Sequence, residues 1–335
     1  MQWRQSIEKL IRREFGIWRV AALPGLIVVA LVVFARLTGT LQRAEWFALD
    51  TLLRLRPAET TDERILIVGI DEEDLHQIHT YPVPDRQIAA LIGKLQQHQP
   101  TVIGLDIFRD LPIEPGHADL VKMFQSSPNL LGIEKVIPDP STVNPPLALP
   151  PNQVGFADAI VDSDGFLRRS LLGTSTLNAQ YQLSFTLQLA ERYLAAHHLQ
   201  LENGIRDPIA FRFGTTELSR FLPDNGGYVN ADAGGNQVLI HFRSGHRPFH
   251  IVSLQDVMQG RVADHLIRDR VVLIGITANS IKDVVNVAGV QGKESRLVNG
   301  VEVQAHAVSQ IVSAVLDQRP LLQVWADGWE YVWIV

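Results

Sequence analysis

The sequence predicts an α/β fold with a mixed, largely parallel buried sheet flanked by helices, and three apolar runs carry this prediction. The runs are RILIVGID at residues 64–71, TVIGLDIF at 101–108 and RVVLIGIT at 270–277. Each is nearly continuous in apolar residues, as expected of a strand that is buried on both faces. A helical pattern separates the first run from the second, so these pieces are predicted to form a βαβ unit with a right-handed crossover.

The helical pattern lies at residues 84–99. Apolar side chains recur at spacings of three and four between Ile88 and Leu95, which gives a helix one apolar face. Asp85 stands where it can cap the start of this helix, and Pro100 ends it.

The rest of the domain alternates predicted helices and strands. Residues 155–174 are predicted to form a hairpin whose turn, Asp162–Gly165, has a glycine for the positive φ. Residues 137–151 hold six prolines and are predicted to be a loop or extended arm. Further helices are predicted at 117–125, 184–199 and 301–316, with a short one after the N-cap Ser253, and further apolar or strand segments at 129–136, 210–213 and 238–244.

Composition narrows the class of protein. The chain has 335 residues, 46% of them hydrophobic, which is enough for a well-buried core. Its formal net charge of −6 gives no indication of nucleic-acid binding. Cysteine is absent, which excludes disulfides, thiolate metal sites and a cysteine nucleophile. No repeat is visible, nor any linker inside residues 64–320, so one domain over residues 45–320 is the simplest organisation.

The N-terminal region is predicted to cross a membrane. Residues 20–35 carry no charge, and the apolar stretch continues to Leu37, close to the roughly 20 residues that a transmembrane helix needs. A cleaved signal peptide is the alternative, but its apolar core is usually only about 7–15 residues long. We therefore expect a transmembrane helix at 20–37, with the basic segment 1–19 in the cytoplasm and the main domain on the periplasmic or extracellular side of the inner (plasma) membrane.

The C-terminal region is also typical of a membrane boundary. Residues 325–335 read WADGWEYVWIV, with three tryptophans and a tyrosine followed by aliphatic residues. Aromatic residues gather where a helix enters the bilayer. The segment is therefore predicted to be the start of a second membrane span, and a soluble amphipathic tail is the alternative.

Five segments together resemble a known family. They are FALDTLLRLRP at 47–57, IGLDIF at 103–108, GFADAIVDSDGFLRRSLL at 155–172, VVLIGITANSIKD at 271–283 and NGVEVQAHAVSQIV at 299–312. In this order they resemble the second CHASE sensory family, the extracellular domains of bacterial adenylate and diguanylate cyclases, histidine kinases and serine/threonine kinases. In that family a Thr-Pro pair commonly follows the position of Asp283, where this sequence has Val-Val-Asn-Val-Ala-Gly, so any contact made by that pair is in doubt here.

The resemblance implies a role without implying a ligand. It implies an extracytoplasmic input domain with one membrane helix before it, several after it and a cytoplasmic effector that lies outside these residues. We therefore expect a sensory domain and no enzyme, no cofactor, and a signal relayed through residues 47–55 and 301–316. The expected partners are the lipid bilayer, an unidentified small-molecule or protein stimulus, and a second copy in a homodimer.

Four residues are candidates for ligand binding: Asp71, Asp106, Arg168 and Asp283. The three aspartates fall at or just beyond the ends of buried strands, the edge at which open parallel sheets bind ligands. Asp71 and Asp106 are weak candidates for a divalent metal site, and the alternative is that they cap the turns that follow. Arg168 and Arg169 alternate along a strand, which predicts that one pairs inside while the other meets solvent. The alternative to a ligand role is a local ion pair of either arginine with Asp162 or Asp164 that pins the turn.

Two other functions remain open on the sequence alone. One is a membrane-tethered, metal-dependent hydrolase that would use Asp71, Asp106 and Asp283, although no nucleophile or base stands at a recognisable spacing. The other is a purely structural protein of the cell envelope.

Overall fold

The chain divides into two compact units in the computed structural model, which describes residues 18–138, 141–176, 179–287, 289–290, 297–325 and 327–334. The larger unit comprises residues 50–221 and 233–322. The smaller unit comprises the residues up to 49, residues 222–232 and the residues from 323 onward. Most of the predicted cytoplasmic segment, residues 1–17, lies outside the described residues.

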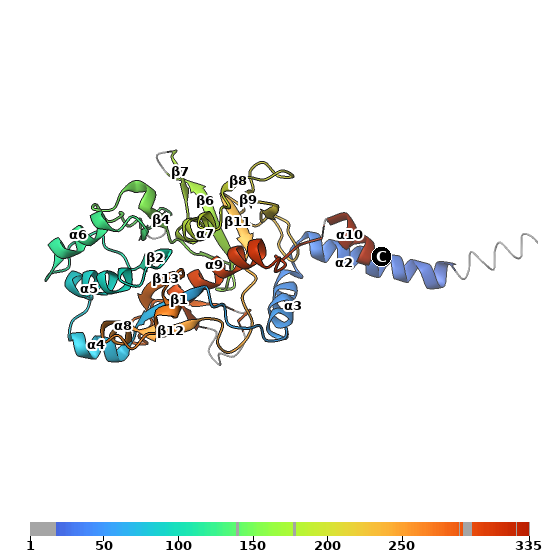
Figure 1. Ribbon diagram of the computed structural model, residues 1–335. Helices are drawn as coiled ribbons and strands as arrows, with labels where there is room; N and C mark the ends of the chain where they lie inside the picture. Colours follow the sequence, from blue (N-terminus) through green and yellow to red (C-terminus); the bar gives the residue numbers. More distant parts are fainter. Residues whose placement is uncertain are drawn as a thin grey trace, which may run out of the picture. The chain divides into compact units, whose positions relative to one another are not determined.

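The larger unit is built on a six-stranded sheet in which every neighbouring pair of strands is parallel (Figure 1). In sheet order the strands are β12 (His250–Ser253), β1 (Ile65–Ile70), β13 (Val271–Ile276), β2 (Val102–Asp106), β3 (Leu130–Glu134) and β4 (Val154–Phe156). The three apolar runs of the sequence form the adjacent strands β1, β13 and β2. The predicted α/β fold with a largely parallel, buried sheet is therefore confirmed.

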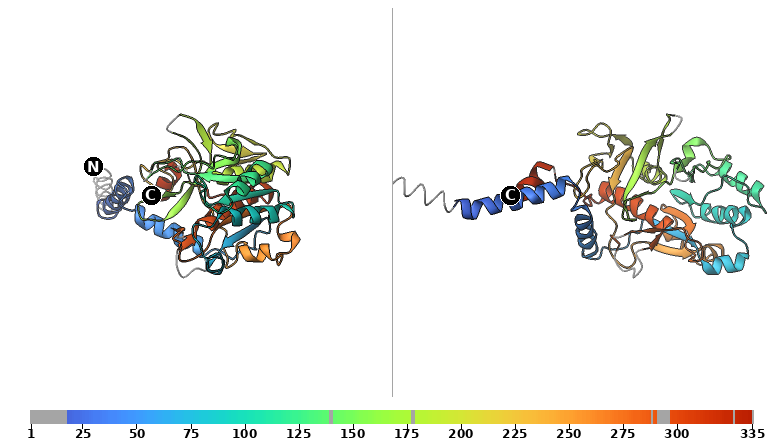
Figure 2. Two further views of the ribbon diagram at one scale, coloured as in Figure 1. Left: turned by 90° about the vertical axis from the view of Figure 1, so that its left-hand side faces the viewer. Right: turned by 180° about the vertical axis from the view of Figure 1, so that it is seen from behind.

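Helices cover both faces of this sheet, and each face has its own hydrophobic core. Successive side chains of a strand point to opposite faces and therefore enter different cores. Ile65 and Ile67 of β1 pack into one hydrophobic core, whereas Leu66 and Val68 pack into the other. The first core also holds α7 (Phe185–Ala195) and α9 (Gly300–Leu316), and the second holds α5 (Asp85–Gln96), α6 (His117–Ser126) and α8 (Leu254–Met258). The three layers can be followed in the two views of Figure 2.

Most predicted helices of the domain are confirmed. The helices predicted at 117–125 and 301–316 are α6 and α9, and α8 begins after Ser253, whose hydroxyl accepts a hydrogen bond from the backbone N–H of Asp256 at 3.0 Å. The prediction that Asp85 caps α5 is wrong. Pro84 occupies the cap position, and the carboxylate of Asp85 is used by a loop described below.

Short antiparallel strands surround the main sheet. They are β5 (Ile160–Val161), β6 (Leu167–Ser175), β7 (Tyr181–Leu183) and β11 (Asn236–Leu239) in one sheet, β8 (Leu201–Asn203), β9 (Phe211–Phe213) and β10 (Thr216–Leu218) in another, and the pair β14 (Val284–Asn286) and β15 (Leu297–Asn299). The predicted hairpin is confirmed as β5 and β6, and Gly165 in its turn has a φ of +86°.

The strand predicted at 238–244 is correct only at its start, since β11 ends at Leu239. The N–H of Ile240 still donates to the carbonyl of Arg168 in β6 at 2.9 Å, but from His241 onward the backbone bonds to side chains of α9. The N–H of His241 donates to Gln310, and the N–H of Arg243 donates to Nδ1 of His306 at 3.2 Å.

The smaller unit contains a π-helical turn (Trp18–Ala22), α2 (Leu23–Leu37), the first part of α3 (Gln42–Arg54) and α10 (Asp327–Ile334). Among the described residues, no single helix is long and apolar enough to span a membrane. Helices α2 and α3 meet that criterion only as a pair, and they are bent by 83° relative to each other. The membrane spans predicted at both ends therefore remain predictions.

Arg36 connects three segments of the smaller unit. Its guanidinium donates to both carboxylate oxygens of Glu45 in α3, at 2.9 and 2.7 Å, and to the carbonyl of Gly226 at 2.8 Å. It also pairs with Glu330 in α10. Trp46 and Tyr228, both buried, pack nearby within the same unit with ring centroids 5.1 Å apart. The helix that leads into the domain and the helix that follows it thus share one arginine.

The packing of α7 on β4 provides a test of this fold. A Cβ at Gly155 would lie 2.5 Å from the backbone N and Cα of Phe185, at the start of α7. We expect Gly155→Ala to destabilise the protein by about 1–3 kcal/mol, because overpacking forces the backbone to move. Urea unfolding followed by circular dichroism measures this change.

Gly93→Ala is the matched control. Gly93 lies in α5, where an added Cβ meets only the sulfur of Met123 at 3.5 Å. This variant should be neutral or up to about 1 kcal/mol more stable, because alanine favours a helix interior. Equal effects of the two substitutions would contradict the close approach of α7 and β4.

Candidate functional site

A cavity of about 610 Å³ opens at the carboxyl-terminal edge of the parallel sheet. Its wall includes Asp106 at the end of β2, Ile276 at the end of β13 and Ile133 in β3. The first turn of α9 contributes Gly300 and Val303. The volume lies in the range of small-molecule sites, roughly 300–1,000 Å³.

The cavity lies where the chain leaves two neighbouring strands in opposite directions. After β2 the chain leads to α6 on one face of the sheet, and after β13 it leads to α9 on the other face. Such a topological switch point leaves a crevice at the carboxyl ends of the strands, and open α/β sheets bind ligands there. The position of the cavity therefore follows from the strand order.

Most of the cavity wall is apolar. Apolar or aromatic side chains come from the loop after β2, the segment before α5, the hairpin region and β14. They are Val83, Ile107, Phe108, Leu111, Ile113, Leu167, Ile281 and Val285, together with Tyr81. Phe108, Leu111 and Tyr81 are exposed, which places them at the opening of the cavity.

Asp106 is the most perturbed carboxylate of the cavity. It is half-buried, and none of the described residues donates a hydrogen bond to its side chain or forms an ion pair with it. Burial, with a further contribution from the negative charge of Asp283, raises the pKa of Asp106 to about 7. Near neutral pH the group is therefore divided between its neutral and ionised forms.

Asp283 is the second carboxylate of the cavity and is more open to solvent than Asp106. Its backbone carbonyl accepts a hydrogen bond from the N–H of Gly300 at 3.0 Å, which holds it at the N-terminus of α9. A Cβ at Gly300 would lie 3.0 Å from Oδ1 of Asp283, so the glycine allows this close approach. Partial desolvation raises the pKa of Asp283 above its usual range.

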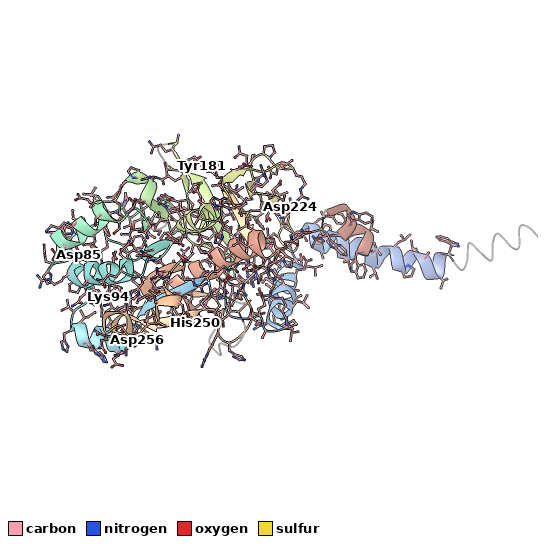
Figure 3. The ribbon with its side chains drawn as sticks, viewed as in Figure 1. Asp85, Lys94, Tyr181, Asp224, His250 and Asp256 are labelled. Carbon is pink, nitrogen blue, oxygen red and sulfur yellow. The ribbon has the colours of Figure 1, made fainter. Side chains whose placement is uncertain are left out.

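Asp85 holds the loop that forms one wall of the cavity; it is labelled in Figure 3. Its buried carboxylate accepts a hydrogen bond from the N–H of Ile113 at 3.1 Å and lies 2.8 Å from Nδ1 of His117. It also lies 3.3 Å from Nε of Arg109. No local sequence pattern indicates this role, because the loop partners of Asp85 are 24 or more positions further along the chain.

Asp71 does not line this cavity. Its carboxylate accepts a hydrogen bond from the N–H of Asp74 at 2.9 Å, and the carboxylate of Asp74 accepts one from the N–H of Asp71 at 3.1 Å. This reciprocal pair caps α4 (Glu72–Ile78), which is the capping alternative considered for Asp71. Of the three candidate aspartates, the structure places Asp106 and Asp283 on one cavity and leaves Asp71 outside it.

The described part of the chain contains no group of three or more histidine, aspartate or glutamate side chains arranged to hold a metal ion. Divalent cations such as Ca²⁺ take six or more oxygen ligands, and two carboxylates supply only part of such a set. The arrangement therefore provides no geometric support for the metal-dependent hydrolase considered above.

Arg168, the fourth candidate, lies in a buried ion-pair cluster and is not part of the cavity wall. Its guanidinium donates to Asp50 at the end of α3 at 2.9 and 2.7 Å, to Asp162 at 3.0 Å and to Asp164 at 2.9 and 2.7 Å. These contacts tie α3 to the β5–β6 hairpin.

The prediction that one of Arg168 and Arg169 meets solvent is wrong, because both are buried. The two faces of β6 are both covered. Arg168 meets the end of α3, whereas Arg169 packs over the ring of Phe221, 4.7 Å from its centroid, and donates to Asp162 in the turn at 2.7 Å. The sequence could not reveal which segments cover the hairpin.

A second polar cluster lies at the other end of α9, and we term it the junction cluster. Its residues come from four parts of the chain: the segment that follows α3, the segment that follows β11, the last turns of α9 and the residues after α9. Its members are Arg56, Glu59, Asp62, Arg64, His241, Arg243, Ser309, Ser313 and Arg319.

Two carboxylates organise the junction cluster. Glu59 accepts two hydrogen bonds from Arg319 at 2.7 and 2.9 Å, and these lower the pKa of Glu59 to about 2, although burial alone would raise it. Asp62 accepts hydrogen bonds from Arg64 at 2.7 and 3.0 Å and from the hydroxyl of Ser309 at 2.6 Å. The segments before and after the domain core are thus bonded to each other and to α9.

His241 lies between two arginines of the junction cluster. Burial lowers the pKa of His241 to about 4, and the positive charges of Arg319 and Arg56 contribute. Its Nδ1 lies 2.7 Å from the carbonyl of Pro320, so the ring also binds the chain that leaves α9. The sequence signal of this cluster is Ser309 and Ser313, two small polar residues four apart on one helix.

Comparison with known proteins gave one informative result. A family model of the CHASE2 domain matches residues 27–335. No curated protein and no solved structure matches the chain.

The raised pKa of Asp106 predicts a stability change that depends on pH. Since the pKa of Asp106 is about 7 in the folded state and ordinarily near 3.8, ionisation of Asp106 opposes folding as the pH rises from 4 to 7. At pH 8, Asp106→Asn should therefore be more stable than the unmodified protein by a few kcal/mol, at most about 4. The gain should shrink steadily below pH 7 and vanish near pH 4, as measured by urea unfolding across this range.

Asp119→Asn, at an exposed position of α6, is the control and should show no such dependence on pH. A stability gain of Asp106→Asn that stays constant from pH 4 to pH 8 would contradict the raised pKa.

Arg168→Gln tests whether Arg168 has a structural role. The change leaves Asp50, Asp162 and Asp164 without the guanidinium that joins them, which should cost about 3–5 kcal/mol of unfolding free energy. The exposed Arg206→Gln should change stability by less than about 0.5 kcal/mol. Chemical denaturation measures both, and a cost as small as that of the control would show that the cluster contributes little.

Proposed function

The chain belongs to the CHASE2 domain family, a family of sensory domains of bacterial signalling proteins, and on this premise we propose that it is the extracytoplasmic input domain of a membrane-bound receptor. A small molecule binds in the cavity at the edge of the parallel sheet, and α9 relays its presence to the segments that join the domain to the membrane. The observation that carries the proposal is that α9 lines the cavity with its first turn and enters the junction cluster with its last turns.

The cavity suits a sensory ligand site. It is concave, mostly apolar and furnished with a few polar groups, the usual make-up of a small-molecule site. Its walls come from segments that are far apart in the sequence, including the loop after β2 and the start of α9. A ligand that contacts these segments together stabilises one arrangement of them over others.

Helix α9 suits the role of a relay. It has 17 residues and so spans about 25 Å, and thirteen of the 17 are buried. A helix packed on nearly all sides moves as a body, because close-packed interiors transmit displacement with little local compression. A shift of Gly300 and Val303 at the cavity would therefore displace Ser309 and Ser313 at the far end.

The junction cluster suits the role of a receiver. Arg319 follows α9 and Glu59 follows α3, and the two form a bidentate ion pair. Ser309 of α9 donates to Asp62, which in turn binds Arg64. Movement of α9 therefore acts on the chain that enters the larger unit and on the chain that leaves it.

The composition of α2 supports attachment to a bilayer. The helix has no buried residue among those the structure describes, although nearly all of its side chains are apolar. Its large apolar side chains, such as Leu26, Leu31 and Phe34, are more than half exposed. Trp329 and Trp333 of α10 are also exposed. Large exposed apolar surfaces of this kind mark membrane or protein contact sites.

A cavity-filling variant tests the ligand site. Ala159 lines the cavity and is exposed, so Ala159→Trp should fill part of the cavity without disturbing the core. The purified full chain would be screened by thermal shift against amines, carboxylates, sugars and nucleosides. A compound that raises Tm in a saturable manner should lose at least tenfold in affinity in Ala159→Trp.

Ala90→Trp, on the exposed face of α5, is the matched control and should bind as the unmodified chain does. Saturable stabilisation that persists in Ala159→Trp would place the ligand elsewhere. Turnover of the stabilising compound would favour an enzyme over a receptor.

The membrane topology can be tested in bacteria that express the full chain with an N-terminal tag. The protein should sediment with the inner membrane. Protease added to spheroplasts should cleave in the larger unit, for example at the exposed loop around Ile205 and Ile209, and leave the tag protected. Cleavage only after the spheroplasts are lysed, or recovery in the soluble fraction, would contradict this placement.

A further inference from the structure

We infer that the cavity takes an organic cation, a molecule whose ammonium group is bound by Asp106 and Asp283 and whose apolar body lies against the cavity wall. The inference rests on the proposed function, because it concerns the same cavity. It adds the chemical class of the ligand, which the family does not supply.

The two carboxylates of the cavity lack a positively charged partner among the described residues. The buried aspartates of the larger unit have partners: Asp50 and Asp162 contact Arg168, Asp62 contacts Arg64, and Asp85 contacts Arg109. The carboxylate of Asp74 accepts backbone N–H groups of α8 at 3.1 and 3.0 Å. In the cavity, by contrast, no described residue supplies a cation or a donor to the half-buried carboxylate of Asp106 or to the more exposed carboxylate of Asp283.

The two carboxylates also repel each other. The negative charge of Asp283 adds to the cost of ionising Asp106. Such a pair of carboxylates opposes folding, and a protein can retain it where the pair binds a ligand. A positive group placed between the carboxylates removes their repulsion and gives each of them a partner. A ligand with an ammonium group supplies that charge and up to three donors.

The cavity offers no corresponding site for an anion. Arg109 contributes to the wall, but its guanidinium donates to the carbonyls of Val83 and Phe108 at 2.9 and 3.2 Å and faces Asp85. The N-terminus of α9 would also attract an anion, but the carboxylate of Asp283 lies beside Gly300 at that position. Asp110 adds a third acidic side chain to the wall.

The remaining wall fits the apolar part of such a ligand. Tyr81 and Phe108 stand at the opening, where their rings can cover a hydrocarbon body or contact a cation through their faces. Ile276, Ile281 and Val285 line the interior. A bare metal ion would leave these apolar surfaces without a partner.

The test uses the full chain and three probes of similar shape: benzylamine, benzyl alcohol and benzoate. Benzylamine should raise Tm in a saturable manner and bind at least tenfold more tightly than benzyl alcohol, and benzoate should not bind. Asp106→Asn and Asp283→Asn should each weaken benzylamine binding at least tenfold, whereas Asp119→Asn on α6 should not.

Binding should also depend on pH. The titratable or charged side chains that line the cavity are Tyr81, Asp106, Arg109, Asp110 and Asp283. Because benzylamine binds the ionised form of Asp106, a proton competes with it, and affinity should fall up to tenfold for each pH unit below about 7. In Asp106→Asn this decline should be reduced.

The outcomes separate this inference from the proposed function. Suppose that benzyl alcohol or benzoate binds as tightly as benzylamine and that Ala159→Trp abolishes this binding. The cavity is then a ligand site, but the inference that its ligand is an organic cation is wrong. If Mg²⁺ alone stabilises the protein and Asp106→Asn abolishes the effect, an inorganic cation replaces the organic one. Failure of both benzylamine and 1,4-diaminobutane to stabilise the chain would also overturn the inference.

Discussion

The packing of α9 along the parallel sheet is the interaction on which the rest of the larger unit depends. Its apolar residues fill the core that it shares with α7, β1 and β13. Its first turn closes the cavity, and its buried serines bind the junction cluster. One helix, buried along most of its length, therefore contributes to both sites, and this is the basis of the proposed relay.

Buried charges in this domain follow a consistent pattern with one exception. An ion pair inside a protein adds stability only when its groups are well paired, and removal of one partner is costly. Arg168 therefore joins α3 to the hairpin, and Glu59 with Arg319 joins the segments on either side of the core. The exception is Asp106, a half-buried carboxylate that shares the cavity with the exposed Asp283 and has no counter-charge from the described residues. Unpaired charge at a concave site at the sheet edge is better explained by a ligand than by the stability of the fold.

The fold could be predicted from the sequence where one local pattern determined the outcome. The runs at 64–71, 101–108 and 270–277 are nearly continuous in apolar residues because β1, β2 and β13 are covered on both faces, and this pattern identifies them as buried strands. The strand predicted at 238–244 failed beyond Leu239 because side chains of α9, about 70 residues away, take its hydrogen bonds.

The same limit applies to the site. The ends of β2 and β13 indicated Asp106 and Asp283, because the carboxyl ends of parallel strands meet at one edge. Asp71 stands at the corresponding position of β1 but is used as a helix cap, a choice that depends on Asp74 three residues later. Asp85 and Arg168 act through partners that are distant in sequence, such as Asp50, which lies 118 positions from Arg168. No local pattern records such pairs.

In the proposed receptor, ligand binding at the start of α9 displaces the end of this helix. The chain contains no cysteine, so spin labels can be attached at two introduced cysteines, Gln125→Cys on α6 and Gln318→Cys after α9, both at exposed positions. The distance between the labels would be measured by pulsed electron paramagnetic resonance on the full chain, with and without saturating benzylamine. We expect a shifted distance distribution with the ligand, and no shift in the same labelled chain carrying Asp106→Asn. Identical distributions in the presence of demonstrated binding would contradict the relay through α9.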